Sequence, residues 1–230
     1  MAMKVLSTMG VKGVFDAIVL AHEDVIGTAV TPVFSPTALL LDRIRAGERA
    51  DAAILTRAGI EALVAEGILT SGTRVDLARS LVGLAVKAGA PKPDISTTEA
   101  VRRALLEARS IAYSRNGQSG IYFAQLLERL GIADEVNTKA IVIESGATAA
   151  EAAAGRAELA VQQVSELMLV PGADVVGPLP SDIQDDVVFS GATFAGAPHA
   201  AEAARMIGCL ADPKHAAVYR ASGLEPLAEE

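Results

Sequence analysis

Small hydroxyl and amide side chains follow the predicted strands of this chain where each strand meets a helix. In sheets of parallel strands, ligands bind beyond the carboxyl ends, where helix N-termini present free N–H groups. Helix capping alone explains any one such residue. Several of these ends at one cleft predict a site of neutral donors, which suits an oxyanion or a carboxylate. The candidates are Ser7 and Thr8, Ser35 and Thr37, Thr56, Ser114 with residues 116–120, Ser145 and Gly146, and Gln162, Gln163 and Ser165.

Two arginines would add positive charge to this site. Arg79 lies within an otherwise apolar predicted strand, DLARSLVG, and Arg115 directly follows Ser114. An arginine in a strand is commonly an edge or ion-pair residue. Its guanidinium fork can also bind a carboxylate through two hydrogen bonds, so both arginines are candidate ligand contacts.

Other site chemistries lack their motifs. TMGVKG at residues 8–13 is not GxGxxG, and SRNGQSG lacks the Gly-Lys-Ser/Thr of a phosphate loop, so no dinucleotide, ATP or other cofactor is expected. No serine stands in a GxSxG elbow. The histidines, His22, His199 and His215, fall on separate predicted helices without a partner at ligand spacing, which predicts solvated side chains and no metal. Cys209, in ARMIGCLAD, is predicted to be a buried helical thiol.

Charge and composition restrict the partners. The formal net charge is -8, aromatic residues make up 3% and there is no Trp, so nucleic acid is not an expected partner. No apolar run approaches the roughly 18 residues of a membrane span. The first residues, MAMKVLSTMGVKGVF, lack the pattern of a secretory signal. The chain as written is therefore expected in the cytoplasm, or in the periplasm if a leader was removed.

The elements that position the candidate residues alternate along the chain. Strands are predicted at KVLS, TAVTPVF, ADAAILT, SIAYS, KAIVIE and ELAVQQ, with helices between them, which implies parallel pairing with βαβ crossovers. Two longer strands lie in VDLARSLVGLAVKAGAP and DDVVFSGATFAG. We expect an α/β fold of two lobes, each a mixed, mostly parallel sheet flanked by helices. Lobe 1 comprises residues 1–82 and 190–230 and lobe 2 residues 83–189, with the long strands as a hinge at a central cleft.

Local patterns predict where some helices start and which face they bury. Ser35 is the expected N-cap of the helix that begins at Pro36. Ser96 and Glu99 have the spacing of a capping box. The helix after SRNGQSG is predicted to bury a stripe at helical spacing: Ile121, Ala124, Leu127 and Leu130.

The order of elements resembles the periplasmic molybdate-binding proteins, which are substrate-binding components of ABC importers with the type II periplasmic-binding-protein fold. The resemblance runs from ADAAILT and ARSLVGLAVKAGAP through SGIYFAQLLERLG and AELAVQQVSE to LADPKHAAVYRASGLEPL. In that family an oxyanion is held by serines after the first two strands, by N–H groups at a helix start of the second lobe, and by a tyrosine after a later strand. The resemblance places these contacts near Thr8 and Met9, near Pro36 and Thr37, at Ser119, near Gly146 and at Gln163.

The chain departs from the family pattern at several of these positions. STMG stands in place of the first serine pair, SPTA in place of the second serine run, and Gln163 in place of the tyrosine. Together with the arginines, these changes favour an organic carboxylate over molybdate. The expected function is a solute-binding protein of the ABC-transporter type that closes over a small anion, with an ABC permease as partner if the chain is exported.

Two alternatives stay open. Aconitate isomerase is similar to molybdate-binding proteins, which raises the possibility of a cytoplasmic isomerase acting on a polycarboxylate. Its base would be Glu144 or Glu166, although each is also explained as a cap or an ion-pair residue. A ligand-sensing module is the second alternative, because effector domains of LysR-type regulators share the fold. No helix-turn-helix segment precedes the first strand, so signalling would require a partner.

Overall fold

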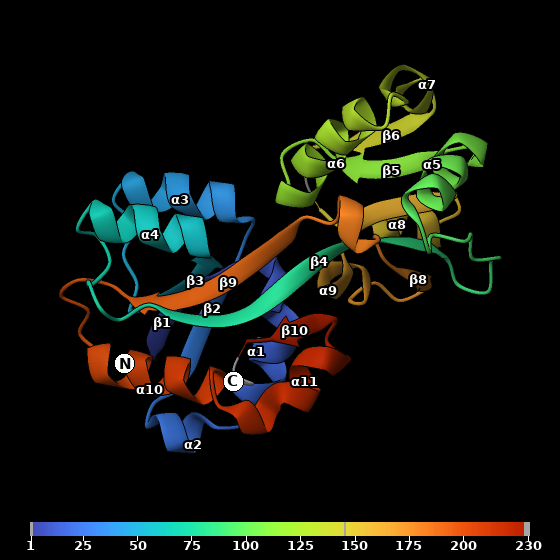
Figure 1. The fold of residues 1–230 in the computed structure, drawn as a ribbon. Coiled ribbons are helices and arrows are strands. Elements are labelled where there is room, and N and C mark those ends of the chain that lie inside the picture. Colours follow the sequence, from blue (N-terminus) through green and yellow to red (C-terminus); the bar gives the residue numbers. More distant parts are fainter. Residues whose placement is uncertain (1, 145, 228–230) are drawn as a thin grey trace. The chain divides into compact units, whose positions relative to one another are not determined.

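A computed structural model describes residues 2–144 and 146–227. The chain divides into two compact units, Met1–Ser80 with Val187–Glu230 (unit 1) and Leu81–Asp186 (unit 2). It passes from unit 1 to unit 2 within β4 (Val75–Lys87) and returns at the start of β9 (Asp186–Thr193), as Figure 1 shows. Both crossings lie in the long strands that the sequence predicts.

Unit 1 is built on three parallel strands. β1 (Met3–Ser7) lies between β2 (Val30–Phe34) and β3 (Ala52–Thr56), and Ser7 is paired with Phe34 on one side and Ile54 on the other. β9 runs antiparallel to β3, and β10 (Leu224–Pro226) runs antiparallel to β4. Because β1, β2 and β3 run in one direction, their carboxyl ends lie at the same edge of the sheet.

Helices cover both faces of the unit 1 sheet. Val5 and Ile54 contribute to one apolar core, and their neighbours Leu6 and Leu55 contribute to another. This alternation places successive side chains on opposite faces, both of them buried. Figure 1 shows α3 and α4 on one face and α10 on the other. The helices are α1 (Lys12–Ile18), α2 (Glu23–Ile26), α3 (Thr37–Arg45), α4 (Arg57–Ala65), α10 (Ala200–Leu210) and α11 (Ala216–Ala221).

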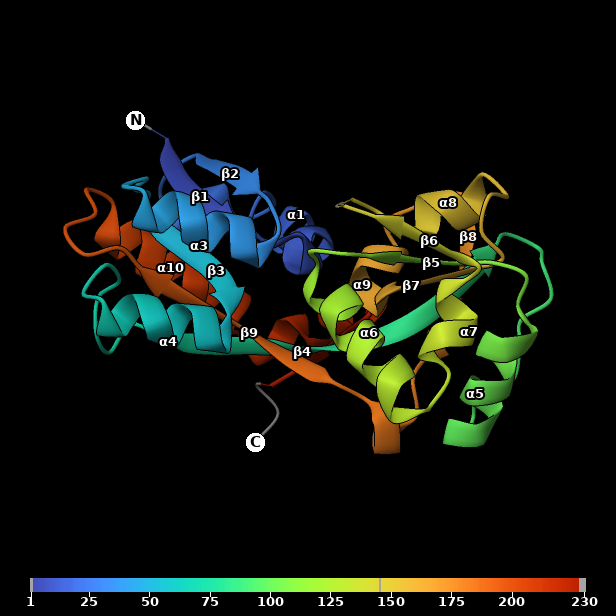
Figure 2. The same ribbon diagram turned by 90° about the horizontal axis from the view of Figure 1, so that it is seen from above.

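Unit 2 has a similar plan. β5 (Ile111–Ser114) lies between β6 (Ala140–Ile143) and β7 (Leu159–Gln163), all parallel, and β4 pairs antiparallel with β7 and with β8 (Ala173–Pro178). Figure 2 shows α5, α6 and α7 on one side of these strands and α8 on the other. The helices are α5 (Thr98–Glu107), α6 (Gln118–Arg129), α7 (Ala133–Asn137), α8 (Ala149–Ala153) and α9 (Val164–Leu167).

The start of α6 packs directly on the end of β5. A Cβ atom added to Gly120 would overlap the carbonyl oxygen of Ser114 and lie 2.8 Å from its hydroxyl oxygen. A Cβ atom at Gly117 would also collide with that hydroxyl. The glycines of SRNGQSG therefore allow the helix to approach the strand end. At Gly120 a larger residue would meet backbone, whereas at Gly117 it would have to displace the Ser114 hydroxyl.

The predicted buried stripe of α6 is wrong at its first two positions. Ile121 is 46% exposed and Ala124 is also exposed, whereas Leu127 is buried and Leu130 is partly buried. The face toward the core instead carries Tyr122 and Phe123, and the Phe123 ring contacts Tyr113 edge-on at a centroid distance of 5.3 Å. Two large aromatic side chains bury more apolar area than Ile121 and Ala124, so they determine which face packs inward.

Two predicted N-caps are displaced by one residue. Pro36, not Ser35, is the N-cap of α3. Thr97, not Ser96, caps α5 by accepting a hydrogen bond from the Ala100 N–H at 3.1 Å. The backbone N–H of Ser96 instead donates to Asp94 at 2.9 Å, and this turn leaves Thr97 as the last extended residue before the helix.

Substitution of the two helical glycines Gly120 and Gly208 should have opposite effects. Gly120→Ala is expected to lower the free energy of unfolding by about 3 kcal/mol or more, because the added methyl group meets backbone that cannot move aside. Gly208 in α10 has open space around its would-be Cβ, so Gly208→Ala should raise stability by about 0.5–1 kcal/mol. Urea unfolding followed by circular dichroism measures both. Equal effects would contradict the close packing of α6 on β5.

Candidate functional site

In unit 1 the backbone ties the ends of the three parallel strands together. The N–H of Thr8 donates to the Ile54 carbonyl at 2.8 Å, and the N–H of Ser35 donates to the Ser7 carbonyl at 3.1 Å. Thr8 is buried, and Met9 begins a short 3-10 turn. The predicted residues at the ends of β1 and β2 therefore lie at one edge of the sheet.

The two other threonines predicted for this edge begin helices. Thr37 is the first residue of α3 and is partly buried. Thr56 ends β3, and its hydroxyl oxygen accepts a hydrogen bond from the Gly59 N–H at 3.2 Å, which makes it the N-cap of α4. A hydroxyl that accepts in this way keeps its own proton for donation, so capping does not exclude a ligand contact.

A charged cluster that the sequence did not predict lies beside Thr56. Arg57 donates to the Asp76 carboxylate at 2.7 Å, and the Ser190 hydroxyl donates to the other oxygen at 2.6 Å. Burial raises the pKa of Asp76, but the hydrogen bonds from Ser190 and Arg57 outweigh it, so the pKa lies below its ordinary value. The only sequence signal was an arginine in the first turn of a helix, where the helix dipole disfavours a cation without an acidic partner.

Arg79 has an ion-pair partner within unit 1. It is paired with Glu225 in the antiparallel ladder of β4 and β10, and its guanidinium lies 3.8 Å from the Glu225 carboxylate. This is the edge role that is common for a strand arginine, so its position needs no ligand to explain it.

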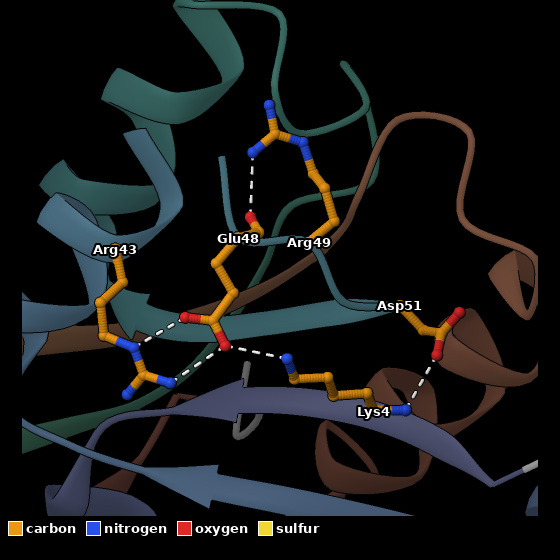
Figure 3. A network of polar contacts seen from close by, with 5 residues as sticks. All are labelled: Lys4, Arg43, Glu48, Arg49 and Asp51. Carbon is orange, nitrogen blue, oxygen red and sulfur yellow. Dashed lines mark hydrogen bonds and ion pairs between the residues drawn. The ribbon is translucent and has the colours of Figure 1, made fainter. Parts of the chain in front are cut away.

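The opposite, amino-terminal edge of the unit 1 sheet carries charged pairs (Figure 3). Lys4 donates through its side chain to Glu48 and through its backbone N–H to Asp51, both at 2.8 Å. Hydrogen bonds from Arg43 and Lys4 hold the pKa of Glu48 below its ordinary value. Charged pairs thus lie at both edges of the sheet, beside Lys4 at the amino-terminal edge and beside Thr56 at the other, whereas Thr8, Thr37 and Thr56 themselves are neutral.

In unit 2 two buried serines lie where β5 meets α6. Ser114 ends β5 and Ser119 is the second residue of α6, 3% and 4% exposed respectively. The N-cap of α6 is Gly117, which provides no side-chain cap for the first N–H groups of the helix. Hydroxyl and N–H donors therefore lie together at this strand end, as the sequence predicts.

The exposed Arg115 is engaged by a carboxylate. Its Nε lies 3.2 Å from one oxygen of Glu144, and Asn116 donates to the other oxygen at 3.2 Å. Glu144 follows β6, so this pair links the ends of two neighbouring strands. Ser145, the next predicted residue, lies outside the described residues.

Gln162, next to the predicted contact Gln163, connects the end of β7 to two other segments. Its Oε1 accepts from both the N–H and the hydroxyl of Thr148 at 2.9 Å. Its Nε2 donates to the Gly146 carbonyl at 3.2 Å and to the Glu166 carboxylate. Gly146 has a φ of 110°, a conformation that favours glycine. The side-chain amide of Gln162 thus fixes the Gly146 segment against β7 and α9.

Gln163, which ends β7, and Ser165 and Glu166 of α9 differ in how their polar groups are satisfied. Gln163 is 5% exposed and has an interaction partner. The hydroxyl of Ser165 is buried and has no hydrogen-bond partner within the described ranges. Burial raises the pKa of the Glu166 carboxyl to about 7, against the opposing effect of the Gln162 hydrogen bond. Glu166 thus combines a pKa raised by burial with a position next to the end of β7, as is common for residues of functional sites.

The expectation of solvated histidines is wrong for His215. It is 8% exposed, its Nε2 lies 4.0 Å from the Cys209 sulfur, and its ring lies 5.4 Å from that of His22. Chain folding brings these helices together, which sequence spacing does not show. Cys209 is only partly buried, and burial raises the pKa of its thiol, the opposite of an activated cysteine.

Among residues 2–144 and 146–227, no group of three or more His, Cys, Asp and Glu could hold a metal ion. Within the same ranges, no helix is long and apolar enough to cross a membrane.

Glu166 should make stability depend on pH. Its carboxyl has an ordinary pKa of 4.5 and a pKa of about 7 in the folded chain. Between pH 4.5 and 7 the Glu166 carboxyl keeps its proton in the folded chain, whereas the unfolded chain has lost it. Protonation of Glu166 therefore stabilises the fold fully below pH 4.5, and this stabilisation is lost as the pH rises through 7. Urea unfolding should show that, as the pH rises from 4.5 to 7, the free energy of unfolding of wild type falls by about 3 kcal/mol relative to that of Glu166→Gln.

Glu144→Gln is the control for this experiment, because the Glu144 side chain is 73% exposed. The free energy of unfolding of Glu144→Gln should change with pH in the same way as that of wild type. If the wild-type and Glu166→Gln profiles ran parallel, Glu166 would not hold the proton.

Comparison with known proteins identifies the family. Residues 3–225 match the family described as bacterial extracellular solute-binding protein. The chain is 34% identical over 229 residues to an aconitate isomerase of a Pseudomonas species, covering 97% of this chain and 87% of that protein.

Solved structures support the fold. The periplasmic molybdate-binding protein of Azotobacter vinelandii matches with a TM-score of 0.79 at 19% identity, covering 96% of this chain and 98% of that one. The tungstate-binding protein of Desulfovibrio alaskensis matches with a TM-score of 0.69 at 15% identity, covering 99% of each chain. At such identities these likenesses show the fold alone, and they confirm the predicted α/β architecture. The match over residues 3–225 shows that the chain belongs to the bacterial extracellular solute-binding protein family.

Proposed function

We propose that this chain binds a small organic polycarboxylate through the strand ends of its two units. The observation that carries the proposal is the set of neutral donors that follow parallel strands, with Thr8 and Thr37 in unit 1 and Ser119 and Gln163 in unit 2. Hydroxyl, amide and backbone N–H groups can each donate a hydrogen bond to a carboxylate oxygen without a compensating charge.

Two features favour a carboxylate over a tetrahedral oxyanion. The relative that matches over nearly the full length is named for aconitate, a tricarboxylate, at 34% identity, whereas the molybdate- and tungstate-binding proteins match at 19% and 15%. In addition, Arg115 is bound to Glu144 at an exposed position, where an ion pair contributes about 0–1 kcal/mol. A ligand carboxylate could therefore replace Glu144 on this guanidinium at little cost.

For a receptor of this kind, the partner would be an ABC permease in the cell envelope. The segments that cross between the units, in β4 and at the start of β9, are the proposed hinge of ligand-driven closure.

A thermal-shift screen against di- and tricarboxylates, molybdate, tungstate and sulfate tests the binding proposal. Carboxylates should raise the melting temperature. Ser119→Ala should weaken their binding about tenfold, because one hydrogen bond to a charged group contributes about 1.5 kcal/mol. Ser71→Ala is the matched control, since Ser71 lies in an exposed turn, and it should bind as wild type does. Stabilisation by molybdate or tungstate alone would exclude an organic ligand.

Isomerisation of the bound polycarboxylate is the second candidate function. It is favoured by the similarity to aconitate isomerase, which extends over 97% of this chain. A receptor and such an enzyme share the requirement for anion donors, but the enzyme also needs a group that can exchange a proton with carbon.

Proton NMR distinguishes the two functions. If the chain is an isomerase, incubation with trans-aconitate should produce cis-aconitate signals, and the reverse reaction should reach the same ratio of isomers. Boiled protein and buffer serve as controls. Binding in the thermal-shift screen without any conversion would assign the chain to the receptor class.

A further inference from the structure

Two glutamates at strand ends of unit 2, Glu144 and Glu166, could act as a base, and their surroundings differ. Glu144 is exposed and is held by Arg115 and Asn116. Glu166 is partly buried, and among the described residues its carboxylate accepts a hydrogen bond only from a neutral amide, that of Gln162. We propose that Glu166 is the residue that removes and returns a proton on an unsaturated polycarboxylate, and that Gln162 is its positioning residue. This inference rests on the isomerase candidate.

Gln162 holds Glu166 in one place because its own amide is fully used. Its oxygen accepts from the N–H and the hydroxyl of Thr148, and its nitrogen donates to Gly146 and to Glu166. Thr148 is itself fixed, because its hydroxyl also lies 3.1 Å from the Val161 carbonyl. Turning the amide over would set its NH2 group against the N–H of Thr148. The Glu166 carboxyl is therefore held beside Gly146, one of the predicted ligand contacts.

Within residues 2–144 and 146–227, no cation is found that would favour the ionised form of Glu166. Helix α9 packs against β7 and β8. β7 is LAVQQ and has no charged side chain, and the one charged residue of β8, Asp174, accepts from the Gly89 N–H at 2.9 Å. On the neighbouring α8, Glu151 is paired with Arg156. The Glu166 pKa of about 7 follows from burial, so near neutral pH the carboxyl can both accept and return a proton.

The proposed reaction on aconitate is an allylic proton shift. The Glu166 carboxylate takes a proton from the CH2 group that lies between one carboxylate and the double bond. The electrons of that C–H bond form a new C=C bond to the central carbon. The π electrons of the original C=C bond then bind the proton that the Glu166 carboxyl returns to the other carbon of that bond. Glu166 is regenerated and no oxidant or reductant is needed. Since the double bond has moved, it can form with either geometry. Negative charge that develops on the terminal carboxylates would be stabilised by the neutral donors.

The test compares wild type, Glu166→Gln, Glu166→Asp and Glu144→Gln with cis- and trans-aconitate. Isomer formation is followed by proton NMR, and binding is followed by thermal shift. Glu166→Gln should lose roughly 10²–10⁴-fold in rate, the usual contribution of a general base, with a ligand-induced rise in melting temperature at least as large as that of wild type. Glu166→Asp should keep part of the activity, and Glu144→Gln should keep most of it. The melting temperature without ligand shows whether each variant folds.

A pH profile and a second variant test the positioning role of Gln162. In wild type, kcat/KM should rise through an inflection near pH 7, and Glu166→Asp should move it. Gln162→Met should lower kcat much more than it changes KM and should shift the same inflection. A Glu166→Gln rate equal to wild type would overturn the inference. So would ligand binding by wild type without conversion, although the carboxylate-binding function would then stand. Absence of both binding and conversion would refute that function as well.

Discussion

Parallel pairing of three short strands in each unit determines where the candidate ligand contacts can lie. A helix or turn follows each strand, so the carboxyl ends of β1, β2 and β3, and likewise of β5, β6 and β7, share an edge with the helix starts. Neutral donors at that edge cost the fold little, because capping or the sheet itself already uses part of their hydrogen-bonding capacity. The close packing of Gly120 on Ser114 brings the α6 donors to the end of β5.

Two carboxyl groups, Asp76 and Glu166, show how partners decide charge inside this fold. Burial opposes ionisation of both. Asp76 has a guanidinium and a hydroxyl as donors, and its pKa falls below the ordinary value. In the part of the chain that the structure describes, Glu166 has only the amide of Gln162 as a donor, and its pKa rises to about 7. One neutral hydrogen bond does not offset burial, whereas an ion pair with a second hydrogen bond does.

The sequence predicted the parts of the fold that depend on strong local patterns. Alternating strands and helices indicated both parallel sheets, and the long strands in VDLARSLVGLAVKAGAP and DDVVFSGATFAG contain the crossings. β8 and β10 were not predicted, because ADVVGP and LEP are short and end in proline, and their pairing with β4 is antiparallel and non-local. The polar networks of Gln162 and Asp76 join residues far apart in sequence, where no spacing rule applies. The strand-end donors could be listed from the sequence. The pairing of Arg115 with Glu144, and the contact of Glu166 with the neutral Gln162 amide, could not be predicted from it.

The surroundings of Glu166 also bear on the choice between receptor and enzyme. Raising the pH from below 4.5 to above 7 ionises this carboxyl and lowers the free energy of unfolding by about 3 kcal/mol. A receptor for anions gains nothing from that cost, because a carboxylate beside Gly146 would repel an anionic ligand, and a glutamine at this position would avoid both penalties. An enzyme that moves a proton on a carbon acid needs a group that changes charge near neutral pH. Repulsion between the Glu166 carboxylate and the anionic ligand would also favour proton transfer, because Glu166 becomes neutral when it takes the proton.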